Sequence, residues 1–226
     1  MAVNEEIFKE VVADLAAKNV DLVAVSKIQS AADIKKLYDL GQRDFGENYV
    51  QELVEKEALL PKDVRWHFIG HLQSNKVKFI APFVCLIQGV DSMKLLREIN
   101  KQAKKSARVI HCLLQVHIAQ EETKFGLDET ELNEIVVALE TEKQNFSHIY
   151  VEGLMGMASF SDDLQKVKRE MKYLKSLFDR YQHLDINNCK MSKLSMGMSG
   201  DYKIAIEEGS NMVRIGSLLF GARSLK

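Results

Sequence analysis

The sequence predicts an α/β fold, a (β/α)8 TIM barrel with an extra N-terminal helix. Short runs rich in valine, isoleucine and leucine alternate with longer segments whose apolar residues recur every three or four positions, as in β/α units around a parallel sheet. Eight such runs fit into 226 residues, close to the usual barrel length of about 250. A doubly wound sheet is the structural alternative, but the glycine-rich turn of nucleotide-binding sheets is missing after the first run.

The elements follow one another in a regular order. An amphipathic pattern between Phe8 and Leu15 predicts the extra helix, and the eight strands are expected at residues 21–26, 44–47, 65–69, 84–90, 108–118, 150–157, 193–197 and 212–215. Apolar residues at helical spacing predict covering helices at residues 34–41, 93–103, 132–139, 164–181 and 202–208. The helix over 164–181 has the clearest apolar face, and Ser161 is expected to cap its first turn.

The composition predicts one domain and argues against several classes of partner. Only two prolines and no linker-like stretch occur, so residues 1–226 are expected to form a single domain. Thirty-one basic and thirty-two acidic residues give a net charge of −1, which argues against binding to nucleic acid or to an anionic membrane. No signal-peptide core and no membrane-spanning apolar run are visible, so we expect a cytoplasmic protein.

No metal centre is predicted. The three cysteines are widely spaced and form no CxxC pair, so we expect free thiols in a reducing compartment. His71 and His117 fall near strand ends but have no second histidine or carboxylate at metal-ligand spacing. His67 and His111 lie within predicted strands, where a histidine usually serves packing, and we assign them no functional role.

Polar residues follow most of the predicted strands, at the end where barrels of this class carry their functional groups. These residues are Lys27, Asn48, His71, Asp91, Ser159, Ser199, Gly216 and Ser217. Partial burial of Lys27 at the end of the first strand would disfavour its ammonium form and leave an amine able to form a Schiff base. The alternative is a lysine that extends from the barrel rim into solvent.

Two segments near the end of the chain are candidates for binding an anion. Ser199 lies where the seventh strand gives way to a helix, and Gly216 with Ser217 follows the eighth strand. Loops after these two strands form the usual phosphate site of such barrels, although each glycine could instead serve a tight turn. Arg214 lies within the apolar eighth strand, where its charge needs either a ligand atom or a barrel carboxylate such as Glu47.

Seven short motifs are spread along the chain. They are AVSK at 24–27, FGENYVQE at 45–52, WHFIGHLQSNK at 66–76, TKFG at 123–126, GLM at 153–155, LSMGMS at 194–199 and VRIGS at 213–217. With these motifs the chain resembles, nearly from end to end, the pyridoxal phosphate homeostasis proteins, which are single-domain relatives of the alanine racemase N-terminal barrel. Members of that family commonly have threonine and proline where this chain has Ile28 and Ser30.

The resemblance implies a cofactor, pyridoxal 5'-phosphate (PLP), held as a Schiff base on Lys27. It also implies which residues surround the cofactor: Ser199, Gly216 and Ser217 at the phosphate, Arg214 at the pyridine nitrogen, and Asn48 beside the ring. The family commonly has threonine at the position of Ser217, and the serine keeps the hydroxyl group.

The resemblance further implies a protein that takes part in intracellular PLP homeostasis, by storage or delivery to PLP-dependent apo-enzymes, and we expect a monomer without enzymatic activity. An arginine at the pyridine nitrogen keeps that nitrogen unprotonated and weakens the cofactor as an electron sink. The chain also ends soon after the eighth strand, so the domain that supplies a tyrosine acid/base in alanine racemases is not expected. One alternative is a PLP-dependent racemase-type enzyme that uses Tyr49, His71 or Asp91, and another is a barrel aldolase in which Lys27 attacks a sugar phosphate.

Overall fold

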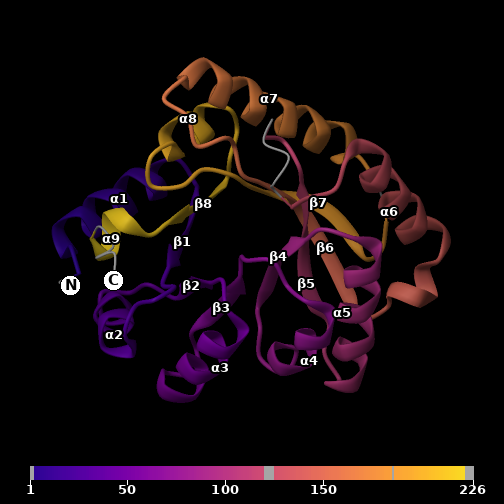
Figure 1. Cartoon of the computed structure of the whole chain (residues 1–226), viewed down its shortest axis with the longest axis horizontal. Helices are drawn as coiled ribbons and strands as arrows, with labels where there is room; N and C mark the ends of the chain where they lie inside the picture. The colour runs from indigo at the N-terminus through magenta and orange to yellow at the C-terminus, as the bar shows by residue number, and fades with distance from the viewer. Residues whose placement is uncertain (1–2, 120–124, 185, 222–226) are drawn as a thin grey trace.

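Eight parallel strands close into a barrel in the computed structural model, which describes residues 3–119, 125–184 and 186–221 (Figure 1). The strands are β1 (Asp21–Val25), β2 (Asp44–Glu47), β3 (Arg65–Phe68), β4 (Leu86–Val90), β5 (Ile110–Val116), β6 (Ile149–Gly156), β7 (Cys189–Ser195) and β8 (Met212–Ile215). Each strand pairs with the next, and β8 pairs with β1 to close the ring. The predicted barrel is confirmed, while Thr123 and Lys124 of the TKFG motif lie outside the described residues.

Helices surround the strands on the outside of the ring (Figure 1). They are α1 (Glu5–Ala17), α2 (Ala31–Asp39), α3 (Val50–Leu59), α4 (Val77–Ile80), α5 (Met93–Lys105), α6 (Glu129–Thr141), α7 (Leu164–Tyr181), α8 (Tyr202–Glu207) and α9 (Ser217–Phe220), with 3-10 turns η1 (Ser74–Lys76) and η2 (Lys143–Phe146). The extra N-terminal helix is α1, and the Asn4 amide before it donates to the Leu219 carbonyl at 2.8 Å. Within the described ranges, every helix is too short or too polar to cross a membrane.

The first turn of α7 is capped by Asp163, not by Ser161 as the sequence predicted. Asp163 Oδ1 accepts hydrogen bonds from the amides of Gln165 and Lys166, at 3.0 and 3.1 Å. Ser161 Oγ accepts instead from the Asp163 amide at 3.1 Å. The prediction was wrong because the Asp163 carboxylate lies next to the unpaired amides of the first turn, two residues closer than the serine.

Apolar side chains form two separate clusters. The larger one combines residues of the strands with residues of the helices and fills the layer between them. The smaller one consists of the buried residues Val23, Leu86, Leu113, Met155 and Met212, all of which come from strands. Because successive side chains of a strand point to opposite faces, this second cluster occupies the inside of the barrel, as is usual for the fold.

Asp44, at the beginning of β2, should make the fold sensitive to acid. Burial opposes ionisation, but hydrogen bonds from Arg65 Nε (2.7 Å) and His67 Nε2 (3.0 Å) outweigh it and lower the pKa of Asp44 to about 2. Because the pKa of Asp44 is lower in the folded state than in the unfolded state, its ionised carboxylate stabilises the fold above about pH 4. That contribution, roughly 2 kcal/mol, is lost as pH falls from about 4 to 2. In acid titrations followed by circular dichroism, Asp44→Asn should lose less stability than the wild type over this range, and equal losses would contradict the assignment.

Candidate functional site

The carboxyl ends of the strands carry the polar residues that the sequence predicted there. Lys27 follows β1 after one residue, Asn48 follows β2 directly, and Gly216 follows β8 directly. In the closed barrel β1 lies between β2 and β8. Lys27, whose side chain is half-buried, therefore lies between the ends of the two strands that precede Asn48 and Gly216.

Both peptide groups that flank Lys27 are held by side chains of α3. The carbonyl of Ser26 accepts a hydrogen bond from Lys56 Nζ at 2.7 Å. The amide of Ile28 donates to Glu52 Oε1 at 2.5 Å. Ile28 has φ = +67°, which a β-branched residue rarely adopts, and its side chain is exposed. The contacts with α3 therefore fix the backbone on either side of the lysine in a conformation that the loop alone would not favour.

A buried cluster of charges supports this loop from the helix side of the sheet. Lys56 Nζ lies 2.8 Å from Glu47 Oε1 and 2.6 Å from Glu52 Oε1. Ser26 Oγ donates to Glu47 Oε1 at 2.5 Å. Burial raises the pKa of Glu47, and the charge of Lys56 opposes that rise. The sequence did not predict this cluster, although a glutamate that closes a buried strand and a lysine four residues after another glutamate were visible signals.

Ser199 and Gly216 come together from two different loops. The Gly216 amide donates to Ser199 Oγ at 3.2 Å. Gly216 has φ = −122°, so no left-handed turn requires the glycine, but a Cβ would lie 3.2 Å from Val25 Cβ on β1. The short helix α9 begins at Ser217, and a cavity of about 330 Å³ lies beside Ser199. The loops after β7 and β8 thus converge where barrels of this class bind phosphate.

Arg214 lies inside the barrel and is almost fully buried. Its Nη1 donates to Ser195 Oγ at 2.6 Å, and its Nη2 donates to the Gly156 carbonyl at 2.9 Å. Burial lowers the pKa of Arg214 to about 10, which leaves the guanidinium charged at neutral pH. An ion pair with Glu47, which the sequence left open, is not formed, because Glu47 pairs with Lys56 of α3.

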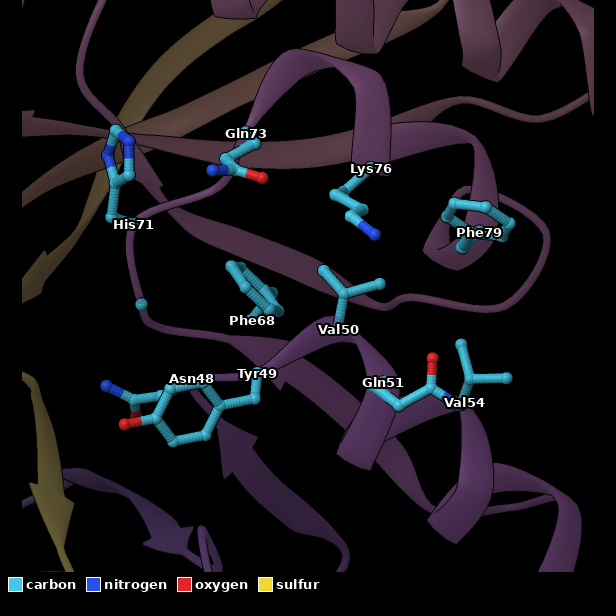
Figure 2. A pocket seen from close by; sticks show the side chains of 11 residues that line it. Asn48, Tyr49, Val50, Gln51, Val54, Phe68, His71, Gln73, Lys76 and Phe79 are labelled. Atoms are coloured by element: carbon cyan, nitrogen blue, oxygen red, sulfur yellow. The ribbon is translucent and has the colours of Figure 1, made fainter.

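Asn48 lies at the mouth of a groove of about 500 Å³ between α3 and the η1–α4 segment. Figure 2 shows Val50 and Val54 on one side of this groove and Lys76 and Phe79 on the other, with Asn48 at one end. Asn48 Oδ1 is buried and has no hydrogen-bond partner among the described residues. A buried acceptor at the barrel rim is suited to a ligand that carries a donor.

His71 forms a pair that the sequence did not predict. Its Nδ1 lies 2.8 Å from Asp91 Oδ2, and its ring stacks on Phe125 with 4.0 Å between the ring centroids. The two partners of the pair follow β3 and β4, which are neighbours in the barrel. Tyr49, the third residue considered as an acid/base, is exposed at the entrance of the groove.

The cysteines and histidines form no cluster suited to a metal ion in the described part of the chain. Cys85, Cys112 and Cys189 are free thiols there. Burial raises the pKa of Cys189 to about 11 and also raises that of Cys112, so neither is a reactive thiolate at neutral pH.

The chain is similar over most of its length to proteins with assigned roles. It matches the family model described as the alanine racemase N-terminal domain over residues 8–224. The pyridoxal phosphate homeostasis protein of Pasteurella multocida is 38% identical over 207 residues, which cover 90% of this chain and 87% of that protein. The Homo sapiens protein of the same name is 40% identical, with 98% of this chain and 84% of that protein covered.

Solved structures agree with these similarities. PipY of Synechococcus elongatus, whose structure was determined with PLP bound, has a TM-score of 0.82 at 32% identity, with 94% of this chain and 99% of that chain covered. Alanine racemase of Streptomyces lavendulae has a TM-score of 0.75 at 14% identity, with 98% of this chain and 58% of that chain covered. At that level of identity the racemase supports the fold alone.

Proposed function

Because the chain belongs to the alanine racemase N-terminal domain family, together with the pyridoxal phosphate homeostasis proteins, we propose that it binds PLP and takes part in PLP homeostasis by storage or delivery. The observation that carries the proposal is the convergence of Ser199 and Gly216 at 3.2 Å on the same rim as Lys27. An amine and an anion-binding loop on one rim are the two features that an aldehyde-bearing phosphate requires.

The residues at the rim fit this cofactor. Lys27 is half-buried just after the end of β1, where it supplies a primary amine at the rim. The buried Oδ1 of Asn48 is an acceptor without a protein partner and suits the ring hydroxyl. Arg214 supplies a charged donor from inside the barrel. Bound PLP supplies an aldehyde carbon that reacts reversibly with amines.

We assign the roles as follows. Lys27 holds PLP as a Schiff base, and Asn48 lies beside its ring. The phosphate is held by Ser199, Gly216 and Ser217 through hydroxyl and amide donors, as in other barrels with a phosphate site after the last two strands. Arg214 donates to the pyridine nitrogen, which a permanently charged neighbour keeps unprotonated.

Storage or delivery is the use that this arrangement favours over catalysis. A pyridine nitrogen kept neutral by Arg214 stabilises negative charge on a substrate poorly, which weakens the electron sink that amino-acid chemistry needs. A reversible Schiff base at an accessible rim suits the release of the cofactor to PLP-dependent apo-enzymes. We propose a cytoplasmic monomer. The apolar faces of the covering helices pack against the barrel, which supports the monomeric state.

The absorption spectrum of the purified protein tests the assignment of Lys27. Wild-type protein mixed with PLP should gain a visible band, and borohydride reduction should fix a pyridoxyl phosphate group on the peptide that contains Lys27. Lys27→Ala should lose both signals because alanine has no amine that can form the Schiff base. Lys76→Ala, which removes another lysine near Asn48, is the matched control and should retain them. A wild type without the band, or a full band in Lys27→Ala, would refute the proposal.

A racemase-type activity is the second candidate, and the pair of His71 with Asp91 favours it. A histidine oriented by a carboxylate at 2.8 Å is a typical proton carrier. Such an activity should exchange the α-hydrogen of an amino acid with deuterium from the solvent, and His71→Ala should slow the exchange. Exchange no faster than with free PLP would reject this candidate for the amino acids tested.

A further inference from the structure

A line of hydrogen bonds crosses the inside of the barrel, which we call the interior chain. It consists of Arg214, Ser195, Gln88, His67 and Asp44. Ser195 Oγ donates to Gln88 Oε1 at 2.7 Å, and Gln88 Nε2 lies 3.0 Å from His67 Nδ1. His67 Nε2 lies 3.0 Å from Asp44 Oδ1. All members except Asp44 are at most 3% exposed, so water does not compete for these contacts.

The two ends of the interior chain, a donor at Arg214 and an acceptor at Asp44, fix the direction of its hydrogen bonds when His67 carries a single ring hydrogen. Arg214 can only donate, so Ser195 Oγ accepts from it at 2.6 Å, and Ser195 Oγ in turn donates to Gln88 Oε1. The Gln88 amide oxygen then faces Ser195, and its NH2 group faces His67. His67 Nδ1 is therefore an acceptor, and the ring hydrogen lies on Nε2, which donates to the Asp44 carboxylate.

The interior chain determines how the guanidinium of Arg214 is oriented. Ser195 holds Nη1 and the Gly156 carbonyl holds Nη2 at 2.9 Å. Two fixed contacts on a planar group set both its position and its plane. Ser195 is itself held in place by Gln88, which β4 contributes from across the barrel.

We propose that Ser195, Gln88 and His67 are positioning residues that hold Arg214 in the orientation required at the pyridine nitrogen of PLP. The inference rests on the proposed function, because PLP is the ligand that this arginine would meet. It also gives a role to His67, for which the sequence pattern predicted none. His67 accepts from Gln88 and donates to Asp44, and so keeps the amide of Gln88 in the orientation that Ser195 requires.

The ring nitrogens of His67 provide a test without cofactor. Nitrogen-15 NMR of the wild-type protein at neutral pH should show a bare Nδ1 and a protonated Nε2. In Gln88→Glu a carboxylate oxygen replaces the NH2 group, so Nδ1 should become protonated as well. A hydrogen on Nδ1 in the wild type, or the same His67 signals in both proteins, would overturn the proposed direction of the interior chain.

PLP binding tests the positioning role itself. Gln88→Met keeps the volume but removes the hydrogen bonds that the amide makes with Ser195, His67 and the Met212 sulfur. We expect roughly tenfold weaker PLP binding, the effect of one lost hydrogen bond to a charged group. The pH titration of the visible band should shift as well. Leu86→Met, a neighbouring change in the interior apolar cluster, should leave both properties unchanged. Ser195→Ala gives the same comparison should Gln88→Met fail to fold.

The outcomes separate this inference from the proposed function. A wild type that binds no PLP refutes the function, and with it the positioning role. The positioning role alone is refuted if the wild type binds PLP and a folded Gln88→Met or Ser195→Ala variant binds it with the same affinity and the same pH titration.

Discussion

Lys56→Met should lower the free energy of unfolding by about 3–5 kcal/mol, because it leaves a buried carboxylate without its cation. Glu47 is 0% exposed and Lys56 is 5% exposed, so solvent cannot replace the lost partner. The variant also frees the Ser26 carbonyl, which Lys56 holds at 2.7 Å, so the backbone before Lys27 should loosen and PLP binding should weaken. Urea unfolding followed by circular dichroism measures the loss of stability.

The matched control is Lys35→Met, which removes another helical lysine paired with an acid four residues away. Both Lys35 and Asp39 are largely exposed, and such pairs contribute little, so the change should stay within about 0.5 kcal/mol. If Lys56→Met cost no more than Lys35→Met, the buried cluster would not hold the loop as we describe.

The dependence on pH gives the same experiment a second readout. Burial already raises the pKa of Glu47 in the wild type, and removal of Lys56 takes away the charge that opposes this rise. A raised pKa means that the folded state favours the neutral acid, so stability is gained as pH falls. The free energy of unfolding that Lys56→Met loses relative to the wild type should therefore be smaller at about pH 5 than at about pH 8. Adding Glu47→Gln to Lys56→Met should recover part of the lost stability at high pH. A loss of stability that does not depend on pH would show that the charge of Glu47 is not its cause.

The strands of the barrel were predictable because buried parallel strands are continuous apolar runs, and eight of them imply closure. Helices were predictable where their buried face was wholly apolar, as in α5 and α6. Helix α3 was missed because its buried face includes Lys56, which interrupts the apolar repeat. Helices α4 and α9 have only four residues each, too few to show a helical period.

The rim of the candidate site was predictable for a geometric reason. The carboxyl ends of parallel strands meet at one edge, so the residues after the runs indicated Lys27, Asn48 and Gly216 without knowledge of side-chain contacts. Contacts across the barrel were not predictable in this way. Ser195 and Gln88 are 107 residues apart and lie on strands that do not pair, so their contact depends on barrel closure and strand register.

Gly153→Ala should destabilise the barrel by more than about 3 kcal/mol, because a new methyl group would overlap the backbone of the neighbouring strand. A Cβ at Gly153 would lie 1.8 Å from the Lys193 carbonyl oxygen of β7, and backbone atoms cannot move aside without breaking the β6–β7 pairing. Gly153 also has φ = +153°, a conformation that residues with a side chain rarely adopt. For a domain of this size the loss corresponds to roughly 6–12 °C in Tm.

Gly200→Ala is the control for this change, because it introduces the same methyl group where there is room for it. No atom lies within 4 Å of the position that a Cβ would take at Gly200, so stability should change by less than about 0.5 kcal/mol. Thermal unfolding of both variants beside the wild type separates steric overlap from the general effect of replacing a glycine. Equal Tm values for Gly153→Ala and Gly200→Ala would show that β6 can move away from β7, and that the close approach of these strands is not required for the barrel.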